Sequence, residues 1–348
     1  FLDYRDIRRR GGGRYGKIIM KIQLSHGFEN IISVDNLLSA WREFIKGKRG
    51  KKDIQGFQLR LMDNIFSLHP DLTNLTYRHD GYQAFNISDP KPRNIHKAIV
   101  RDRLSHHAIY RVLYPFFDRI FIADSFSCRL GKGTHKALNR FRALTYKVSR
   151  NNTRTSWILK CDIKKFFASI NHEILLKILA EYIPDRNILW LLNEVISSFQ
   201  TKPGIGLPLG NLTSQLLVNI YLNGFDQFVK HKLKAKYYIR YADDFVILSE
   251  NRNWLEEQIP FVQEFLFENL KLILHPDKIF IKTLASGVDF LGWVHFADHR
   301  ILRTMTKRRM IRRIQGEPRQ EIVSSYLGLL GHGNAYRIKE NIFDTIFL

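Results

Sequence analysis

The stretch that most constrains the fold is residues 237–249, which read Tyr-Tyr-Ile-Arg-Tyr-Ala-Asp-Asp-Phe-Val-Ile-Leu-Ser. Apolar runs at Tyr237–Ile239 and Phe245–Leu248 flank the acidic pair, so the pattern predicts a strand, a tight turn and a returning strand. The carboxylates of Asp243 and Asp244 would repel each other by roughly a few kcal/mol at an effective dielectric constant of ~20. A fold that holds them at one bend therefore suggests a divalent cation between them. The alternative is a solvated turn, because Asp is a favoured turn residue.

A second acidic element favours the metal interpretation. Residues 157–161 are strand-like, and Asp162 follows them directly. An acid just past the end of an apolar strand lies where active sites of α/β sheets collect. If this strand pairs beside the hairpin, Asp162 joins Asp243 and Asp244. Three clustered carboxylates without a cation would be strongly destabilising or partly protonated, so the pairing predicts Mg²⁺.

The charge of the chain predicts a polyanionic partner. There are 55 Lys and Arg against 33 Asp and Glu, a formal net charge of +22 that is spread along the whole sequence. Nucleic acid is the commonest long polyanion, and a merely basic surface is the alternative. A hydrophobic fraction of 45% predicts a globular chain and excludes a disordered one.

Cysteine usage and hydropathy predict a cytoplasmic protein without a membrane partner. The two cysteines, Cys128 and Cys161, form no Cys-x-x-Cys, so neither a disulfide framework nor a zinc site is indicated. No apolar run approaches the ~18 residues of a membrane span. We expect residues 1–29 to be a disordered or extraneous arm, with residues 1–19 as upstream sequence because the first Met is Met20.

Two further segments are candidates for nucleotide binding. Between the acidic elements, residues 204–215 hold three glycines and a proline before a predicted helix over 212–234, so their backbone can approach a base pair closely. The alternative is a plain connection. In residues 94–114 basic and apolar positions interleave. In a nucleotide polymerase such arginines hold the triphosphate, and Arg101 is the first choice for that role, with Arg93 as the second.

The spacing of apolar residues outlines the remaining elements. We expect two packing helices in 30–68 and a proline-rich connection in 69–93. Towards the C-terminus we expect a helix over 254–270, strands at 272–274 and 278–284, and a hairpin over 288–301 that turns at Asp298-His299. Asp289 lies between Val and Phe and is interpreted as structural.

These elements, in this order, resemble reverse transcriptases from about Leu37 to the C-terminus. Asp162 with Phe166-Phe167 is similar to the first palm motif, residues 241–244 to the Tyr-x-Asp-Asp motif, and the run Phe290, Leu291, Gly292, Trp293 to the primer grip. The resemblance implies an α+β fold, a right-hand polymerase with fingers, a palm of antiparallel sheet plus helices, and a small helical thumb. The implied boundaries are 30–93 for an N-terminal helical region, 94–150 for the fingers, 151–302 for the palm with some finger elements, and 303–348 for the thumb.

Within that family the chain resembles the enzymes of diversity-generating retroelements. Many bacterial members have Gln-Gly and Ser-Pro in the loop where this chain has Leu209-Gly210 and Ser214-Gln215. Residues 132–135 and 331–334 also resemble the enzymes of diversity-generating retroelements. The resemblance implies copying of a template-repeat RNA into cDNA with errors at template adenines, helped by a small basic accessory variability protein. A group-II-intron-like or defence-associated reverse transcriptase is the alternative, although the chain leaves no room after the thumb for maturase and endonuclease regions. A non-catalytic RNA-binding protein is the alternative of another class.

The resemblance also implies two-metal nucleotidyl transfer on template RNA, primer and deoxynucleoside triphosphates. Asp162, Asp243 and Asp244 would be catalytic and would hold two Mg²⁺ ions, with Mn²⁺ as an alternative and the carbonyl of Ile163 as a further ligand. Phe167 would exclude a 2′-hydroxyl, with Phe166 as the core aromatic. The remaining predicted nucleotide-binding residues are Leu209, Gly210 and Gln215.

Overall fold

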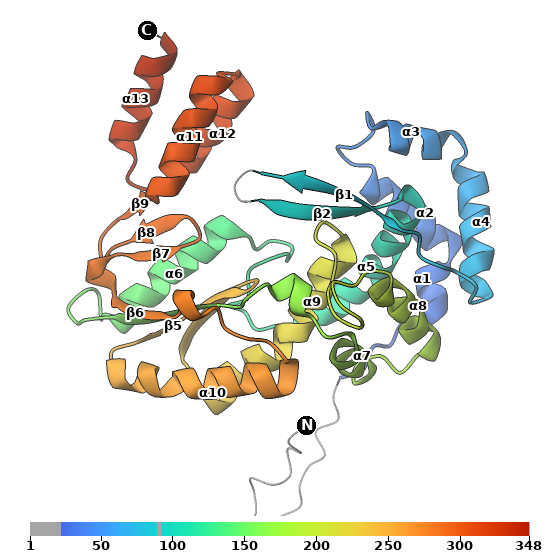
Figure 1. The fold of residues 1–348 in the computed structure, drawn as a ribbon, viewed down its shortest axis with the longest axis horizontal. Helices are drawn as coiled ribbons and strands as arrows, with labels where there is room; N and C mark the ends of the chain where they lie inside the picture. Colours follow the sequence, from blue (N-terminus) through green and yellow to red (C-terminus); the bar gives the residue numbers. More distant parts are fainter. Residues whose placement is uncertain (1–21, 89–91, 348) are drawn as a thin grey trace, which may run out of the picture.

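The computed structural model describes residues 22–88 and 92–347 (Figure 1). Most of the expected N-terminal arm therefore lies outside the described residues. Within the described part of it, Leu24 and Phe28 are buried, and the Leu24 N–H donates to the carbonyl of Tyr182 at 2.8 Å. Residues 24–29 are thus packed against the domain rather than forming a free arm, because two apolar side chains there find a core.

The N-terminal region consists of short helices instead of the two that the spacing predicts. Their bounds are α1 Phe28–Ile32, α2 Val34–Phe44, α3 Lys52–Leu59 and α4 Leu61–Thr73. Ser33 separates the first two, because its side chain accepts the Asn36 N–H and caps a new helix. Arg60, at φ −122°, separates α3 from α4. Pro70 does not end α4, which runs on to Thr73.

A four-stranded antiparallel sheet forms the centre of the described structure. Its order is β4-β5-β3-β6, with β3 Trp157–Asp162, β4 Tyr237–Tyr241, β5 Asp244–Ser249 and β6 Phe280–Thr283. Helix α10, Arg252–Leu270, covers one face, and α6, Thr134–Val148, covers the other (Figure 1). Alternate residues of a strand point to opposite faces, so Leu159 and Phe245 join the core on the α10 side, whereas Ile158 and Val246 join the core on the α6 side.

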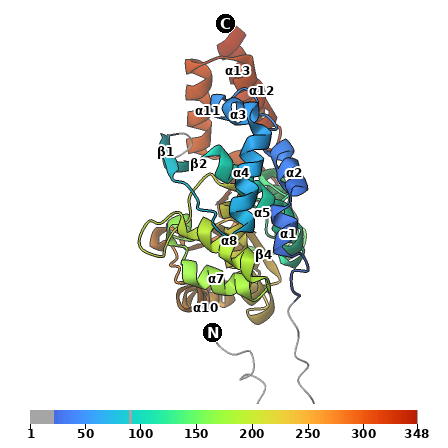
Figure 2. The ribbon, with the colours of Figure 1, turned by 90° about the vertical axis from the view of Figure 1, so that its right-hand side faces the viewer.

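A second, mainly helical layer lies beside the sheet. The hairpin of β1 Tyr82–Ile87 and β2 Arg93–Ala98 leads into the long helix α5, Val100–Ile120, which packs against α2 and α9. The other helices of this layer are α7 His172–Ala180, α8 Arg186–Ser197 and α9 Leu212–Gln227. Figure 2 shows α7 and α8 on the same side as α1, α2 and α4. A π-helical turn, Phe228–Lys232, extends α9 over most of the predicted 212–234.

The C-terminal part differs most from its prediction. Instead of one hairpin, β7 Val288–Phe290, β8 Trp293–His295 and β9 Arg300–Leu302 form a three-stranded sheet, because the chain also reverses at Leu291 and Gly292, which have φ +52° and +84°. Residues 272–274 are not a strand, since Leu274 makes only an isolated bridge to Ile163. The chain ends in α11 Thr304–Gly316, α12 Gln320–Leu330 and α13 Tyr336–Phe347, which stand together at one end of the molecule (Figure 1).

Among the helices in residues 22–88 and 92–347, none combines the length and the apolar character that crossing a bilayer requires.

Candidate active site

The acidic hairpin forms as its sequence predicts. Strands β4 and β5 are joined by Ala242 and Asp243, and Tyr241 pairs with Asp244 across the ladder. Ala242 has φ +55°, in the left-handed region that costs a non-glycine residue about 1–2 kcal/mol. Contacts elsewhere must therefore hold the turn in shape.

Arg240 supplies such a contact from inside the protein. Its guanidinium is buried, and Nη1 donates to the carbonyl of Ala242 at 3.0 Å. Nε and Nη2 bind the two carboxylate oxygens of Asp226 at 2.7 and 2.6 Å, a bidentate pair between β4 and α9. The hydroxyl of Tyr238 donates to Asp226 at 2.7 Å. This network fixes the turn relative to α9.

Asp162 lies directly opposite Asp244, because β3 pairs antiparallel with β5 in that register. Facing residues of an antiparallel pair project from the same face of the sheet. The N–H of Ile163 donates to the carbonyl of Asp243 at 3.2 Å, which ties the end of β3 to the turn. The structure thus brings Asp162, Asp243 and Asp244 to one corner of the sheet.

Burial perturbs these carboxyl groups. Desolvation raises the pKa of Asp244 to about 7, the charges of Asp162 and Asp243 add to the rise, and the ammonium of Lys160 opposes it. The pKa of Asp243 is also raised, first by desolvation and then by Asp162, while Lys278 and Arg93 oppose the shift. Such shifts, caused by burial and like charges together, are typical of functional sites.

Two lysines that the sequence reasoning missed are the counter-ions. Lys160 Nζ lies 3.3 Å from Asp244 Oδ2, and Lys278 Nζ donates to Asp162 Oδ2 at 3.0 Å. Side chains alternate between the two faces of a strand, so Lys160, two residues before Asp162, lies on the same face of β3. This spacing in the sequence could have predicted Lys160 as a counter-ion. Lys278 lies on a short 3₁₀ turn after α10, and no local pattern identifies it.

The donor set fits a hard divalent cation. Asp244 Oδ1 is buried and has no hydrogen-bond partner among the described residues, so it has an unused acceptor. Carboxylate and carbonyl oxygens are the ligands that Mg²⁺ prefers, and the carbonyl of Ile163 adjoins them. However, no group of three His, Cys, Asp or Glu side chains within residues 22–88 and 92–347 already has the spacing of a metal centre. The lysine ammonium groups hold the carboxylates in this arrangement.

The two candidate triphosphate arginines have different surroundings. Arg93 is exposed at the start of β2, and its charge acts on Asp243. Arg101 instead binds Asp71 at 2.5 Å and stacks on the ring of Tyr77 at 4.9 Å. The preference for Arg101 over Arg93 is therefore corrected: Arg101, in the first turn of α5, is paired with Asp71 of α4, whereas the charge of Arg93 acts on Asp243.

The glycine-bearing loop, residues 204–215, is hydrogen-bonded both to β2 and to the segment after β3. The N–H of His96 donates to the carbonyl of Leu209 at 3.0 Å, and the N–H of Leu207 donates to the carbonyl of Phe167 at 2.8 Å. Gly210 has φ +107°, and a Cβ there would lie 2.8 Å from Ile95 Cγ2, so glycine is required at this approach.

The aromatic and polar candidates near this loop are differently exposed. Phe166 is buried, in agreement with its expected core role, and Phe167 is half-buried on the 3₁₀ helix Phe166–Ser169. Leu209 is half-buried, as is Gln215 in the first turn of α9. These positions leave Phe167 and Leu209 partly accessible to a ligand.

The predicted primer grip is the β7–β8 turn. Phe290 and Trp293 are buried, while Leu291 and Gly292 form the reversal, whose Gly292 carbonyl accepts the Arg303 N–H at 3.1 Å. Lys160 Nζ also donates to the carbonyl of Asp289 at 2.8 Å, so one lysine links this turn to the acidic corner. The Asp289 carboxylate pairs with Arg303 at 2.9 Å, consistent with its structural interpretation.

Comparisons with known proteins agree with this arrangement. A model of the family "Reverse transcriptase (RNA-dependent DNA polymerase)" matches residues 88–295, more than half of the chain. Protein YkfC of Escherichia coli is 25% identical over 287 residues, which cover 70% of this chain and 72% of that protein.

Other relatives are encoded in introns. Group II intron-encoded protein LtrA of Lactococcus lactis is 24% identical and covers 60% of this chain, and a putative COX1/OXI3 intron 2 protein of Saccharomyces cerevisiae is 24% identical and covers 61%. The matches span only 44% and 30% of those two proteins.

Among solved structures, telomerase from Candida albicans, in a complex with a fragment of telomeric RNA, superimposes with a TM-score of 0.50. The match covers 79% of this chain and 56% of that chain at 13% identity. At that identity the likeness concerns the fold alone, and it confirms the predicted mixture of helices and antiparallel sheet.

Proposed function

Because the chain belongs to the reverse transcriptase family, we propose that it is an active RNA-directed DNA polymerase that makes cDNA by two-metal nucleotidyl transfer. The observation that carries the proposal is the acidic corner, where Asp162 faces Asp244 across β3 and β5 and Asp243 occupies the adjoining turn. A protein that only bound RNA would gain nothing from these like charges, one of which has a buried oxygen without a partner.

In this mechanism Asp162, Asp243 and Asp244, with the Ile163 carbonyl, would hold two Mg²⁺ ions, or Mn²⁺ in their place. When bound, the ions lower the pKa of the primer 3′-hydroxyl and neutralise charge on the triphosphate and the leaving pyrophosphate. Metal binding requires the carboxylates to be ionised, and Lys160 and Lys278 must release their oxygens.

The surrounding residues would position the substrates. Arg93, whose charge acts on Asp243, is the proposed triphosphate ligand, because its planar fork of donors matches phosphate oxygens. Phe167 would lie under the sugar of the incoming nucleotide and exclude a 2′-hydroxyl. Leu209, Gly210 and Gln215 would contact the nascent base pair, and the β7–β8 turn would hold the primer end.

Substitution of Asp243 by Ala tests the polymerase proposal. We expect a loss of Mg²⁺-dependent cDNA synthesis of at least about a thousandfold on a primed RNA, because one metal ligand is removed. Asp63→Ala, at an exposed position on α4, is the matched control and should retain full activity. Retained synthesis by the Asp243 variant would refute the proposal, and RNA binding by an inactive wild type would favour the non-catalytic alternative.

We further propose that the enzyme belongs to a diversity-generating retroelement. It would copy a template-repeat RNA with errors at template adenines, assisted by a small basic accessory variability protein. Support comes from Leu209, which stands where many bacterial relatives have Gln, and from Gln215 in place of Pro. An apolar side chain beside the nascent base pair cannot form hydrogen bonds that test the geometry of the pair. Losing such hydrogen bonds has a large effect on the discrimination between correct and incorrect substrates.

Substitution of Leu209 by Gln tests this subfamily proposal. We expect misincorporation opposite adenine to fall about tenfold, with errors opposite the other bases little changed. Leu209→Met keeps volume and polarity nearly constant and should keep the wild-type error spectrum. Sequencing of cDNA products from one defined template measures the error spectra of both variants. An unchanged error spectrum in the Gln variant would contradict the subfamily proposal.

The second candidate is a group-II-intron-like or defence-associated reverse transcriptase. The similarity to LtrA and the yeast intron protein favours it. The two candidates differ in the wild-type product: an error rate that is low and even across the four template bases would favour the intron-like enzyme.

A further inference from the structure

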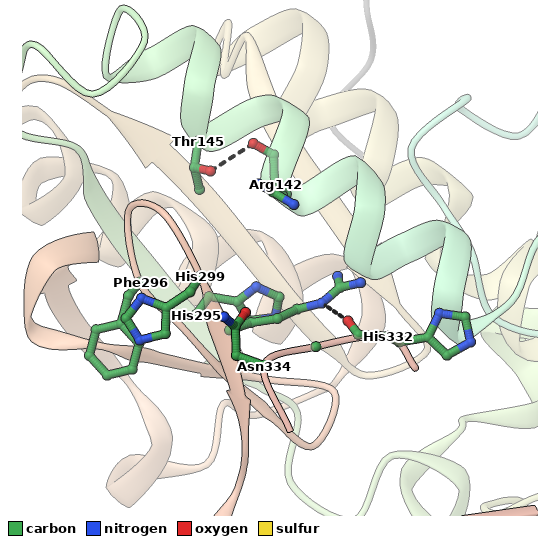
Figure 3. Close-up of a pocket in the computed structure, with 9 residues that line it drawn as sticks. Arg142, Thr145, His295, Phe296, His299, His332 and Asn334 are labelled. Carbon is green, nitrogen blue, oxygen red and sulfur yellow. Dashed lines mark hydrogen bonds between the residues drawn. The ribbon is translucent and has the colours of Figure 1, made fainter. Parts of the chain in front are cut away.

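A small cavity lies where α6, the β8–β9 turn and the connection between α12 and α13 meet, apart from the acidic corner. Its volume is about 60 Å³. The lining residues used below are Arg142, His295, His299, Arg300, His332 and Asn334, and no acidic side chain is among those that line it in the described part of the chain. Figure 3 shows that His295, His299 and Asn334 come from one side and Arg142 from the facing helix.

Two of the lining residues carry buried polar atoms without a hydrogen-bond partner among the described residues. His295 is only 3% exposed, and its Nε2 is buried without a hydrogen-bond partner among the described residues. Arg300 Nη1 is in the same condition. The rest of that guanidinium is fixed, because Nε donates to the carbonyl of His332 and Nη2 to Asn139 Oδ1. Unsatisfied buried polar groups of this kind are rare and point to a missing partner.

The charges around the cavity also lack a counter-ion. Neither Arg142 nor Arg300 forms an ion pair within residues 22–88 and 92–347, and burial followed by the charge of Arg142 lowers the pKa of Arg300. Among the described residues, the guanidinium of Arg142 makes a long hydrogen bond to the Tyr146 hydroxyl, at 3.4 Å, and lies over the ring of Tyr146 at 5.6 Å. In the described part of the chain, the one carboxylate bonded to a lining residue is that of Asp298, which binds His299 Nδ1 from an exposed position. Two guanidinium groups that line one cavity without a lining acid favour an anion between them.

The size of the cavity selects among anions. A volume of 60 Å³ would hold about four to six water molecules, given roughly 10–15 Å³ for each, which is room enough for the four oxygens of one tetrahedral oxyanion. Guanidinium groups bind phosphate oxygens through parallel donors. We propose that this cavity binds a phosphate group, held by the guanidinium groups of Arg142 and Arg300.

The phosphate has two sources with the same chemistry: free orthophosphate or a backbone phosphate of the nucleic acid. In either case it would connect α6 to the base of the C-terminal helices. The two sides already touch there, since the rings of His135 and His332 stack with centroids 3.6 Å apart. Gly333 lies directly against Trp293 of β8.

The first arm of the test is calorimetric titration of the full chain, without nucleic acid, with orthophosphate against chloride at equal ionic strength. We expect binding of one phosphate per chain, weakened about tenfold or more by Arg142→Gln, because a charge-assisted hydrogen bond is lost. Arg142 is exposed, so this variant should fold, whereas Arg300→Gln also breaks the contacts to His332 and Asn139. Lys147→Gln removes one charge from the same helix outside the cavity and should leave binding unchanged.

The second arm measures binding of a primed RNA over a range of salt concentrations. If the nucleic acid supplies the phosphate, orthophosphate will not saturate the site, but Arg142→Gln will reduce the salt slope by about one and Lys147→Gln will not. Saturable orthophosphate binding that depends on Arg142 identifies the free ion instead. If Arg142→Gln and Lys147→Gln behave alike in both arms, the proposal is overturned. The titration arm does not depend on polymerase activity, so its failure is distinct from a failure of the Asp243 experiment.

Discussion

Asp244 is the residue whose surroundings best support the proposed cation at the acidic corner. It is opposed by Asp162 across the ladder, adjoins Asp243 in the chain, and keeps one buried oxygen without a donor. Its pKa of about 7 compares with about 3.9 for an Asp in an unfolded chain. In metal-free protein near neutral pH, ionising this carboxyl therefore opposes folding.

This difference predicts a pH dependence of stability with a definite sign. Because the folded pKa is the higher one, the protonated carboxyl stabilises the fold below about pH 4, and that contribution is lost as the pH rises through about 7. Relative to Asp244→Asn, the wild-type free energy of unfolding in EDTA should fall by about 2 kcal/mol between about pH 5 and pH 8. Urea unfolding measures it, and adding Mg²⁺ at the higher pH should reverse the fall. Parallel pH profiles for the two proteins would contradict the assignment.

Among the elements, the β4–β5 hairpin depends on a buried network that lies behind it. Arg240 is the second-to-last residue of β4, and its guanidinium reaches both Asp226 on α9 and the carbonyl of Ala242 in the turn. The left-handed Ala242 is thereby held by a donor from its own strand. We infer that Arg240 is a positioning residue for Asp243.

Substitution of Arg240 by Met should separate positioning from stability. The single variant leaves Asp226 charged and unpaired in the core, so the free energy of unfolding should drop by about 3–5 kcal/mol. The double variant Arg240→Met, Asp226→Leu removes that buried charge and should recover most of the loss, but the Ala242 carbonyl still lacks its donor. We therefore expect the double variant to fold and to polymerise poorly at saturating Mg²⁺. Wild-type activity in the double variant would show that the network is only structural.

For the molecule as a whole, the position of the C-terminal helices relative to the sheet depends on a contact without spare room. Gly333, between α12 and α13, packs on Trp293, and a Cβ at Gly333 would lie 2.1 Å from Trp293 Cζ3. Either the ring or the connection would have to move. Trp293 also belongs to the predicted primer grip, so a shift there would reach the primer end.

Gly333→Ala should therefore weaken both packing and primer handling. We expect about 1–3 kcal/mol of destabilisation from overpacking and shorter products in single-round primer extension. Gly328→Ala is the matched control, because a Cβ there meets nothing within 4 Å and Ala favours α12 by up to about 1 kcal/mol. Equal product lengths and equal stabilities for the Gly333 variant and the wild type would show that the C-terminal helices tolerate displacement.

The sequence alone was sufficient for the parts whose information is local. The alternation around residues 237–249 predicts the hairpin, the run before Asp162 predicts β3, and together they predict the acidic corner and the polymerase fold. The reversal at Leu291 and the breaks at Ser33 and Arg60 were not predicted, because a single capping oxygen or left-handed residue leaves little trace in apolar spacing.

Contacts between distant segments were decided only by the folded chain. Lys278 donates to Asp162, which is 116 residues away in the sequence, and Arg101 forms an ion pair with Asp71. Arg300 and Arg142 both line a cavity that no sequence motif predicts. Pairing partners of charged side chains depend on where helices and loops pack in three dimensions, and hydrophobic periodicity carries no information on that. The residue types for the chemistry can thus be predicted from the sequence, whereas their counter-ions and the proposed phosphate site result from tertiary packing.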